Sequence, residues 1–413
     1  MTENDRHVSI DAVRGFAVLG ILLMNIVGMG LPAFAYLTPT YYGGHEGANL
    51  WAWAINYVVS DGKMRGLFTM LFGASLMLIA DRAEGQRPGP AAIHYRRVFW
   101  LFVFGMLHAY LLFFGDILVT YAIAGAIVFP ARKWPSKLLV GVGAVILALL
   151  AAKGLYETHH LHGLREAAQA PGASEAARKA WEAQAFIFNP PAELGQRELA
   201  GYRGDFFDAM KARAFMASLL QTVFLITETL WEAIAQMMIG IALYRSGFFT
   251  LGWKSRSYGT LIAIGYGLGA PLTAWMAWRV AQSGFEPFLR QEMSYWAALP
   301  RPFIALAHAS ALLLLVRSGA LNWLVDRLAA AGRMALSNYL GTSIITAFVF
   351  CGFGLGLFGH LERYQLYGVV AGVWLLILLW SKPWMASFHY GPFEWAWRSL
   401  TRWKPQPFVR RAT

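Results

Sequence analysis

Two polar positions on the first apolar segment have the residue types of an anion site and a hydrogen-bond donor. Arg14 and Asn25 are eleven residues apart. On an α-helix this spacing puts both on one face, about 16 Å apart along the axis. Asp11 precedes Arg14 by three residues and is placed to pair with it. We therefore predict an anion-binding group at one end of this helix and an amide nearer the other end.

A histidine and an aspartate follow in a later apolar stretch. His108 lies in an apolar context, and Asp116 follows a turn marked by Gly115. Eight helical residues would separate them by about 12 Å, so direct contact is not expected unless the helix breaks at Gly115. A nearby carboxylate stabilises imidazolium, which makes His108 a candidate general base. The alternative is a hydrogen-bonded core histidine. His45, in a polar loop, is a second candidate base or a solvated histidine.

Acidic side chains recur inside another long apolar segment. Glu228, Glu232 and Gln236 are spaced by four and would share one helix face. Two carboxylates within a membrane need cations, water or a proton path. Lys63 and Arg65 are candidate partners, because they interrupt a different apolar segment. This stripe predicts a polar cavity and favours a proton-coupled transporter or exporter.

Composition identifies the class of protein that must position these residues. Of 413 residues, 57% are hydrophobic and only 14% are charged, against roughly a quarter charged in soluble domains. The net charge of +12 sits in short clusters between apolar runs, a pattern of membrane orientation and not of nucleic-acid binding. Cys351 is the single cysteine, so an intrachain disulfide or a cysteine-based metal site is excluded. We expect no metal.

The apolar runs predict an all-α bundle of about ten transmembrane helices, since each crossing needs about 20 apolar residues. The predicted spans are 10–30, 52–80, 96–114, 116–131, 137–154, 215–245, 257–279, 301–318, 334–356 and 364–382. The second span has a polar interruption at Asp61, Gly62 and Lys63. We treat residues 1–413 as one transmembrane domain.

The basic residues of the short loops predict the orientation. Lys and Arg favour the cytoplasm, and placing both chain ends there leaves few basic residues in the short outer loops. Those few are Arg279, Arg290, Arg301 and Arg363. Residues 155–214 are then an extracytoplasmic insertion with a short helix from Glu175 to Phe186, acting as a solvated cap or as a lid over a substrate. Residues 383–413 form a cytoplasmic tail, where tryptophans and arginines between Pro392 and Trp403 predict an interfacial helix.

Five separated segments resemble the YeiB family of bacterial polytopic membrane proteins. These segments are Ser9 to Asn25, Leu71 to Gly73, His108 to Tyr121, Gly332 to Tyr339 and Gly391 to Thr401. The likeness covers nearly the whole chain and keeps the motif order. It implies a multi-pass protein of the bacterial inner membrane, with membrane lipids as partners.

The opening motif is also similar to that of transmembrane acyltransferases, such as heparan-alpha-glucosaminide N-acetyltransferase and bacterial sugar O-acyltransferases. This resemblance implies transfer of an acyl group, such as acetyl, from cytoplasmic acyl-CoA to an extracytoplasmic hydroxyl or amine. The acceptor would be a small molecule or a glycan. Arg14 matches an arginine of the sugar O-acyltransferases, but Asn25 stands where those enzymes have a functional histidine. The identity of the base therefore differs from theirs.

The acyltransferase hypothesis gives each candidate residue a role. Arg14, oriented by Asp11 and helped by Arg333, would hold the phosphates of acyl-CoA. His108 would deprotonate the acceptor, and Asn25 would stabilise the oxyanion that develops on the thioester carbonyl. Further polar residues are expected to line the cavity: Glu228, Glu232, Gln236, Asn338 and Tyr121. Transporter and non-catalytic scaffold remain alternatives, and a homo-oligomer remains open.

Overall fold

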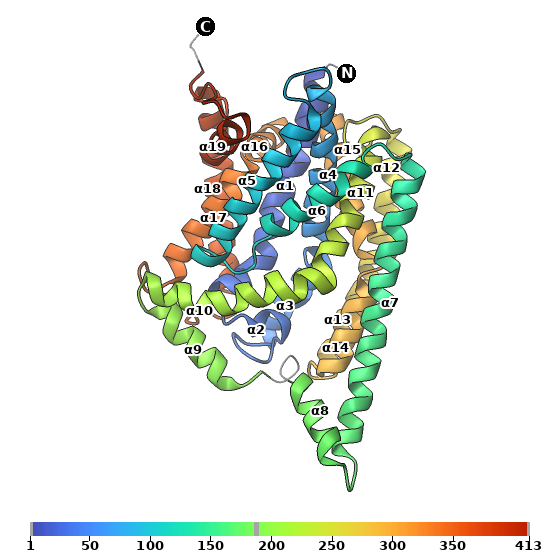
Figure 1. Cartoon of the computed structure of the whole chain (residues 1–413), viewed down its shortest axis with the longest axis vertical. Helices are drawn as coiled ribbons and strands as arrows, with labels where there is room; N and C mark the ends of the chain where they lie inside the picture. The colour runs from blue at the N-terminus through green and yellow to red at the C-terminus, as the bar shows by residue number, and fades with distance from the viewer. Residues whose placement is uncertain (1–2, 186–189, 411–413) are drawn as a thin grey trace.

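The protein is helical throughout the part that the structure, a computed structural model, describes, namely residues 3–185 and 190–410. The described N- and C-terminal ends lie at the same end of the molecule (Figure 1). This arrangement agrees with the predicted placement of both on one side of the membrane. The prediction of an all-α protein is confirmed.

The helices follow one another with short connections. The first half contains α1 (Glu3–Gly30), α2 (Phe34–Leu37), α3 (Gly47–Val59), α4 (Lys63–Ala83), α5 (Pro90–Leu111), α6 (Leu118–Ala131), α7 (Ser136–Gln169), α8 (Glu175–Ala185), α9 (Ala192–Arg203) and α10 (Phe206–Leu219). The second half contains the π-helix η1 (Leu220–Thr229), α11 (Leu230–Arg245), α12 (Ser255–Ile264), the π-helix η2 (Gly265–Gly269), α13 (Ala270–Gln282), α14 (Pro287–Ala297), α15 (Arg301–Ser318), α16 (Asn322–Arg333), α17 (Ala335–Phe350), α18 (Leu366–Ser387) and α19 (Pro392–Arg402).

Several of these helices, alone or together with the helix that follows them, are long and apolar enough to cross a bilayer. Within the described residues there are 7 such stretches, namely Val8–Gly30, Gly47–Ala83, Ser136–Gln169, Phe206–Arg245, Ser255–Gln282, Arg301–Ser318 and Leu366–Ser387. Leu118–Ala131 and Ala335–Phe350 are shorter apolar helices. The chain is therefore a multi-pass membrane protein, whereas the number of ten spans and the orientation stay predictions.

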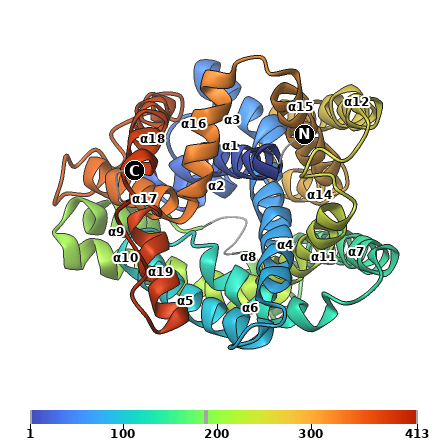
Figure 2. The same ribbon diagram turned by 90° about the horizontal axis from the view of Figure 1, so that it is seen from above.

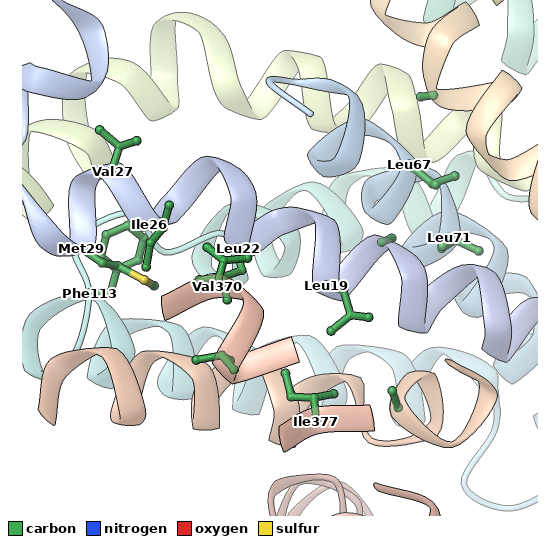
Figure 3. Packing of buried hydrophobic residues seen from close by; sticks show 14 of the residues in the cluster. Leu19, Leu22, Ile26, Val27, Met29, Leu67, Leu71, Phe113, Val370 and Ile377 are labelled. Atoms are coloured by element: carbon green, nitrogen blue, oxygen red, sulfur yellow. The ribbon is translucent and has the colours of Figure 1, made fainter. Parts of the chain in front are cut away.

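Helix α1 lies near the centre of the bundle, with other helices around it (Figure 2). Its apolar side chains pack against α18, where Leu19 and Leu22 belong to the same buried cluster as Val370 and Ile377 (Figure 3). The indole of Trp374 on α18 donates a hydrogen bond of 3.0 Å to the carbonyl of Leu19. Because α1 is enclosed, polar residues on it face other helices.

Two predicted spans differ from the observed helices. The predicted span 52–80 is broken between α3 and α4 at its polar interruption, where Gly62 adopts a φ of 73°. This left-handed conformation strains residues that carry a side chain. Helix α7 runs to Gln169, well past residue 154, so part of the predicted insertion continues a spanning helix. The predicted short helix appears as α8, and the interfacial helix as α19; Phe186 and residues 411–413 lie outside the described residues.

The end of the molecule opposite the described chain ends is covered by α8 and α9 (Figure 1). Glu198 on α9 accepts a hydrogen bond of 2.8 Å from the backbone N–H of Ala33, which precedes α2. Burial raises the pKa of Glu198 from 4.5 to about 7, and the hydrogen bond from Ala33 opposes this only in part. Burial therefore favours the neutral form of Glu198, whereas the hydrogen bond from Ala33 favours the carboxylate, and burial has the larger effect.

The raised pKa of Glu198 predicts that α9 docks more tightly at acidic pH. The folded state holds the proton more strongly than the unfolded state, so docking stability is greatest below about pH 4.5 and falls until about pH 7. The protection factors of α9 amides, obtained from hydrogen exchange after correction for the intrinsic effect of pH on exchange, measure this change. Glu198→Gln should remove the pH dependence of the protection factors. Protection that increases between pH 5 and 7 in the wild type would contradict the assignment.

Candidate functional site: a basic cavity beside a buried histidine

A cavity of about 690 Å³ opens at the end of the bundle where both described chain ends lie. Its walls come from α1 near Asp11, α4 from Phe68 onward, the first half of α5, the start of α6, the junction of α16 and α17, and α19. Segments from the N-terminal and C-terminal parts of the chain, within 10–121 and 332–402, thus enclose one space. Its volume lies within the range of about 300–1,000 Å³ that is usual for small-molecule sites.

The mouth of this cavity is strongly basic. Its lining arginines are Arg14, Arg82, Arg97, Arg333, Arg398 and Arg402. The lining carboxylates are Asp11 and Glu394, and both are engaged: Asp11 with Arg14 at 2.8 Å, and Glu394 with the start of α17. The surplus of guanidinium groups suits an anion with several charges, since each can donate paired hydrogen bonds to phosphate.

Arg14 is held in place by neighbours on two helices. Its guanidinium donates to Asp11, as the spacing of three residues predicts, and also to the hydroxyl of Ser75 on α4 at 3.1 Å. The side chains of Arg14 and Asp11 keep about a fifth of their surface exposed. Arg14 is therefore oriented in the cavity wall and remains open to a ligand.

A close crossing of α1 and α16 brings Arg14 and Arg333 to the same cavity. A Cβ atom on Gly332 would lie 1.8 Å from the carbonyl oxygen of Asp11, and one on Gly15 would lie 2.0 Å from the carbonyl oxygen of Leu328. Only glycine permits backbones to approach this closely. The glycines adjacent to the two arginines allow the helices to come close enough for both arginines to line one cavity.

Helix α19 closes one side of the cavity through Glu394. This carboxylate accepts hydrogen bonds from the backbone N–H groups of Leu336 at 2.6 Å and Ser337 at 3.1 Å, and from the Ser337 hydroxyl. These groups lie in the first turn of α17, where unpaired N–H groups and the helix dipole favour an anion. Arg97 of α5 also stacks on Trp397 of α19, with 4.2 Å from guanidinium carbon to ring centroid.

Removing this carboxylate should loosen α19. Glu394→Ala leaves two buried N–H groups without their acceptor, a change that costs about 1–3 kcal/mol per group. We expect a lower thermal midpoint and faster proteolysis after α18 in detergent. Glu84→Ala, at an exposed loop position, is the control and should leave both measurements unchanged. Equal proteolysis of the two variants would show that α19 is held by other contacts.

The inner part of the cavity is apolar and ends on two tyrosines. Phe68, Leu101 and Leu118 line it together with Tyr121 and Tyr339. The hydroxyls of Tyr121 and Thr69 are 2.7 Å apart, and the Tyr339 hydroxyl accepts from the N–H of Ile117 at 3.4 Å. The predicted cavity residue Tyr121 thus does line a cavity. The change from a basic mouth to an apolar floor distinguishes the two ends of a bound molecule.

His108 lies directly behind Tyr339, with ring centroids 4.9 Å apart. Its Nδ1 is 2.8 Å from Asp116 Oδ1, and its Nε2 is 2.8 Å from the hydroxyl of Ser343 on α17. A carboxylate only accepts, so Nδ1 carries the proton of the neutral ring and Nε2 accepts from Ser343. The His108 and Asp116 side chains have no exposed surface.

The condition set for contact between His108 and Asp116 is met, because the helix breaks between them. Helix α5 ends at Leu111, and a turn over residues 112–117 brings Asp116 back against the helix. The break begins at residue 112 and includes Gly115. Asp116 also accepts from the N–H of Val119 at 2.8 Å. Its carboxylate therefore caps the start of α6 and orients His108 at the same time.

Other predicted site residues do not join this group. Asn25 is half-buried on α1 and does not line the cavity, although Arg14 on the same helix does. His45 lies before α3 and packs edge-on against Phe285, with 5.8 Å between ring centroids. The roles expected for Arg14, Asn25 and His108 require one shared pocket, which the described residues do not form. Arg14 reaches the cavity, and His108 lies behind its floor.

The predicted acidic stripe is divided among separate partners and does not line the cavity. Glu232 pairs with Arg65 at 2.8 Å, as one of the predicted pairings proposed, and accepts from Gln236 at 3.0 Å. Glu228 accepts from the Tyr295 hydroxyl at 2.9 Å. The π-helix η1 contains Glu228, and its wider turn changes the register on which the prediction depended.

Asn338 also serves the packing of helices. Its amide donates to the carbonyl of Ala331 at 3.0 Å and to the hydroxyl of Ser381 at 3.2 Å, and it accepts from Trp380 at 3.1 Å. These bonds tie α16, α17 and α18 together, and Asn338 is not a lining residue of the cavity. Of the five residues predicted to line a polar cavity, only Tyr121 lines the cavity described here.

Sequence reasoning missed several residues that the structure brings to the site. Arg97 belongs to a basic segment that indicated only orientation, and Arg398 and Arg402 belong to the predicted interfacial helix. Ser343 stands 235 residues from His108 in the chain. Its signal was the run of hydroxyl side chains along α17, which includes Ser337, Thr342 and Ser343.

Comparisons with known proteins agree with the resemblance. The family described as a protein of unknown function (DUF418) matches residues 243–404. The uncharacterized protein YeiB of Escherichia coli (strain K12) is 34% identical over 99% of this chain and 100% of the relative. The uncharacterized protein YxaH of Bacillus subtilis (strain 168) is 25% identical over 99% of this chain and 97% of that protein. No solved structure matches. The chain therefore belongs to the YeiB family of polytopic membrane proteins, whose function is unknown.

Proposed function

We propose that this protein is a transmembrane acyltransferase that uses acyl-CoA from the cytoplasm and an acceptor hydroxyl or amine from the other side of the membrane. The observation that carries the proposal is the cavity, which is lined by arginines at its mouth and by apolar side chains at its floor. The buried pair of His108 and Asp116 lies just behind that floor. Acyl-CoA has the matching polarity, with phosphates at one end and an acyl thioester at the end of a thin arm.

The arginines at the mouth supply the binding energy for the phosphates. Arg14 and Arg333 are joined by the backbone crossing of α1 and α16, while Arg398 and Arg402 are brought by α19. Charge-assisted hydrogen bonds to phosphate are shorter and stronger than those between neutral groups. The pantetheine arm would run between Phe68 and Leu101 toward Tyr339, with the thioester nearest to His108.

His108 supplies proton transfer. The neutral ring with its proton on Nδ1 presents a lone pair on Nε2, which accepts from a hydroxyl at 2.8 Å. Asp116 holds this tautomer and stabilises the imidazolium formed when Nε2 takes a proton. Tyr339 stands between the cavity and the histidine, so its side chain must move for the thioester to reach His108.

The neighbours of the acidic residues Glu228 and Glu232 favour acyl transfer over proton-coupled transport. The carboxylates of Glu228 and Glu232 are each bonded to a different neighbour, and neither lines the cavity. A proton-coupled transporter needs such groups along the path of its substrate. The cavity formed by the described residues is basic at its mouth and apolar at its floor, which suits the phosphates and the acyl end of acyl-CoA.

Binding of labelled acetyl-CoA to purified protein in detergent tests the proposal. Arg333→Gln should weaken binding by about tenfold or more, because a charged hydrogen bond to phosphate contributes about 1.5–3 kcal/mol. Arg256→Gln removes the same charge from an exposed position that does not line the cavity and should change the affinity less than twofold. Binding of the wild type should also weaken with salt. Absence of acetyl-CoA binding in the wild type would refute the proposal.

A further inference from the structure

Ser343 forms a hydrogen-bonded chain with His108 and Asp116. Its side chain on α17 is 1% exposed, and its hydroxyl donates to His108 Nε2 at 2.8 Å. The other ring nitrogen of His108 donates to Asp116 at 2.8 Å. Both nitrogens are therefore occupied, and an acceptor proton reaches His108 only if Ser343 is displaced or takes part in the reaction.

The position of Ser343 connects it with the cavity. Tyr339, which lines the cavity floor, precedes Ser343 by four residues on the same helix. Residues four apart lie on one face of a helix, about 6 Å along the axis. Ser343 is thus the next side chain of that face beyond the floor, and the ring of His108 contacts both residues.

We propose that Ser343 is a nucleophile that carries the acyl group as a covalent ester between the two substrates. This inference rests on the proposed function. A serine bonded to a histidine that is oriented by a carboxylate is activated for attack on acyl carbons, and such triads recur on unrelated folds.

The reaction divides into two balanced steps. First, Ser343 Oγ bonds to the thioester carbonyl carbon, the carbon–sulfur bond breaks, and the serine proton passes through His108 Nε2 to the leaving thiolate of coenzyme A. Second, the acceptor oxygen or nitrogen attacks the ester carbon, and its proton passes through His108 to the departing Ser343 oxygen. Asp116 stabilises the imidazolium in both steps.

A covalent intermediate also resolves the geometry of a reaction across a membrane. The basic cavity opens at one end of the bundle, whereas the acceptor is proposed to arrive from the opposite side. A direct transfer requires both substrates to meet in one site. An acyl group held on Ser343, inside the bundle, lets coenzyme A leave before the acceptor binds, which predicts a two-step kinetic scheme.

Mass spectrometry of the full-length protein in detergent tests this inference. After incubation with acetyl-CoA and no acceptor, we expect one acetyl group per chain on the peptide that contains Ser343, with an equal amount of free coenzyme A. Ser343→Ala should lose the label, and Ser343→Cys should keep it as a thioester that hydroxylamine cleaves. Ser310→Ala is the matched control, because Ser310 is also fully buried; it should be labelled like the wild type. A serine that only positions His108 would not acquire an acyl group.

The possible results separate this inference from the proposed function. If the wild type binds acetyl-CoA but stays unlabelled, and releases coenzyme A only with an acceptor, Ser343 is not a nucleophile and direct transfer stands. If acetyl-CoA does not bind, the acyltransferase proposal fails, and reaction of the protein with diisopropyl fluorophosphate then tests whether Ser343 is an activated nucleophile. Phosphorylation of Ser343 by this reagent that is lost in His108→Ala supports an activated nucleophile, and absence of phosphorylation in the wild type overturns it.

Discussion

Asp116→Asn is expected to slow acyl transfer by about 10⁴-fold, the loss that an equivalent change causes in a serine–histidine–aspartate triad. In this protein the carboxylate accepts the Nδ1 proton of His108 at 2.8 Å. An asparagine amide can instead donate to Nδ1, which moves the ring proton to Nε2. His108 can then no longer take a proton from Ser343 or from an acceptor. Single-turnover release of coenzyme A measures the effect.

Binding and chemistry should separate in this variant. Asp116 does not line the basic cavity, so the affinity for acetyl-CoA should stay within about twofold of the wild type while the rate falls. Asp326→Asn is the control, since its carboxylate pairs with Lys382 at 2.9 Å where both side chains are about half exposed. A rate unchanged by Asp116→Asn would show that the pair of His108 and Asp116 is structural.

Gly332→Ala is expected to have the second large effect, on folding and on binding together. The new Cβ would stand 1.8 Å from the Asp11 carbonyl oxygen and 2.7 Å from the Gly15 nitrogen. Backbone atoms cannot rotate away as a side chain can, so α1 and α16 must separate. Overpacking of this kind costs typically about 1–3 kcal/mol, and we expect the upper end of that range. The thermal midpoint in detergent measures the loss.

The same variant should weaken acetyl-CoA binding, because separation of α1 and α16 moves Arg14 away from Arg333. Gly341→Ala on α17 is the matched control, since its new Cβ would meet nothing within 4 Å. It should be neutral or slightly stabilising, as alanine is favoured over glycine in a helix. If Gly332→Ala matched this control in stability and affinity, the close backbone crossing would not be what holds the cavity together.

Local patterns could be predicted because they depend on residues near one another in the chain. Apolar runs specified the spanning helices, and the polar interruption at Asp61 and Gly62 marked the break between α3 and α4. The ion pair of Asp11 and Arg14 followed from a spacing of three on one helix. A helix between Pro392 and Trp403 was predicted from its mixture of tryptophan and arginine, and α19 is that helix.

Predictions that extended one helical register over many residues were less reliable. Glu228 and Glu232 were expected to share a face, but Glu228 lies in η1 and Glu232 in α11, and they contact different elements. His108 and Asp116 were expected about 12 Å apart unless the helix broke at Gly115, and α5 ends a few residues earlier, at Leu111. A π-helical turn or an early helix end changes which side chains share a face, and the hydropathy of the sequence does not reveal either.

By itself the sequence determined a helical, multi-pass membrane protein, because insertion of apolar segments into lipid depends mainly on composition and local order. It also predicted basic residues near the end where both described termini lie, because lysine and arginine favour one side of a membrane. Only the tertiary structure decided which polar groups meet. The arginines of α1, α5, α16 and α19 share a cavity because glycine backbones and Glu394 bring those helices together. Ser343 of α17 meets His108 of α5 across 235 residues through a hydrogen bond between their side chains. Such contacts depend on packing between distant segments, for which a single sequence carries no periodic signal.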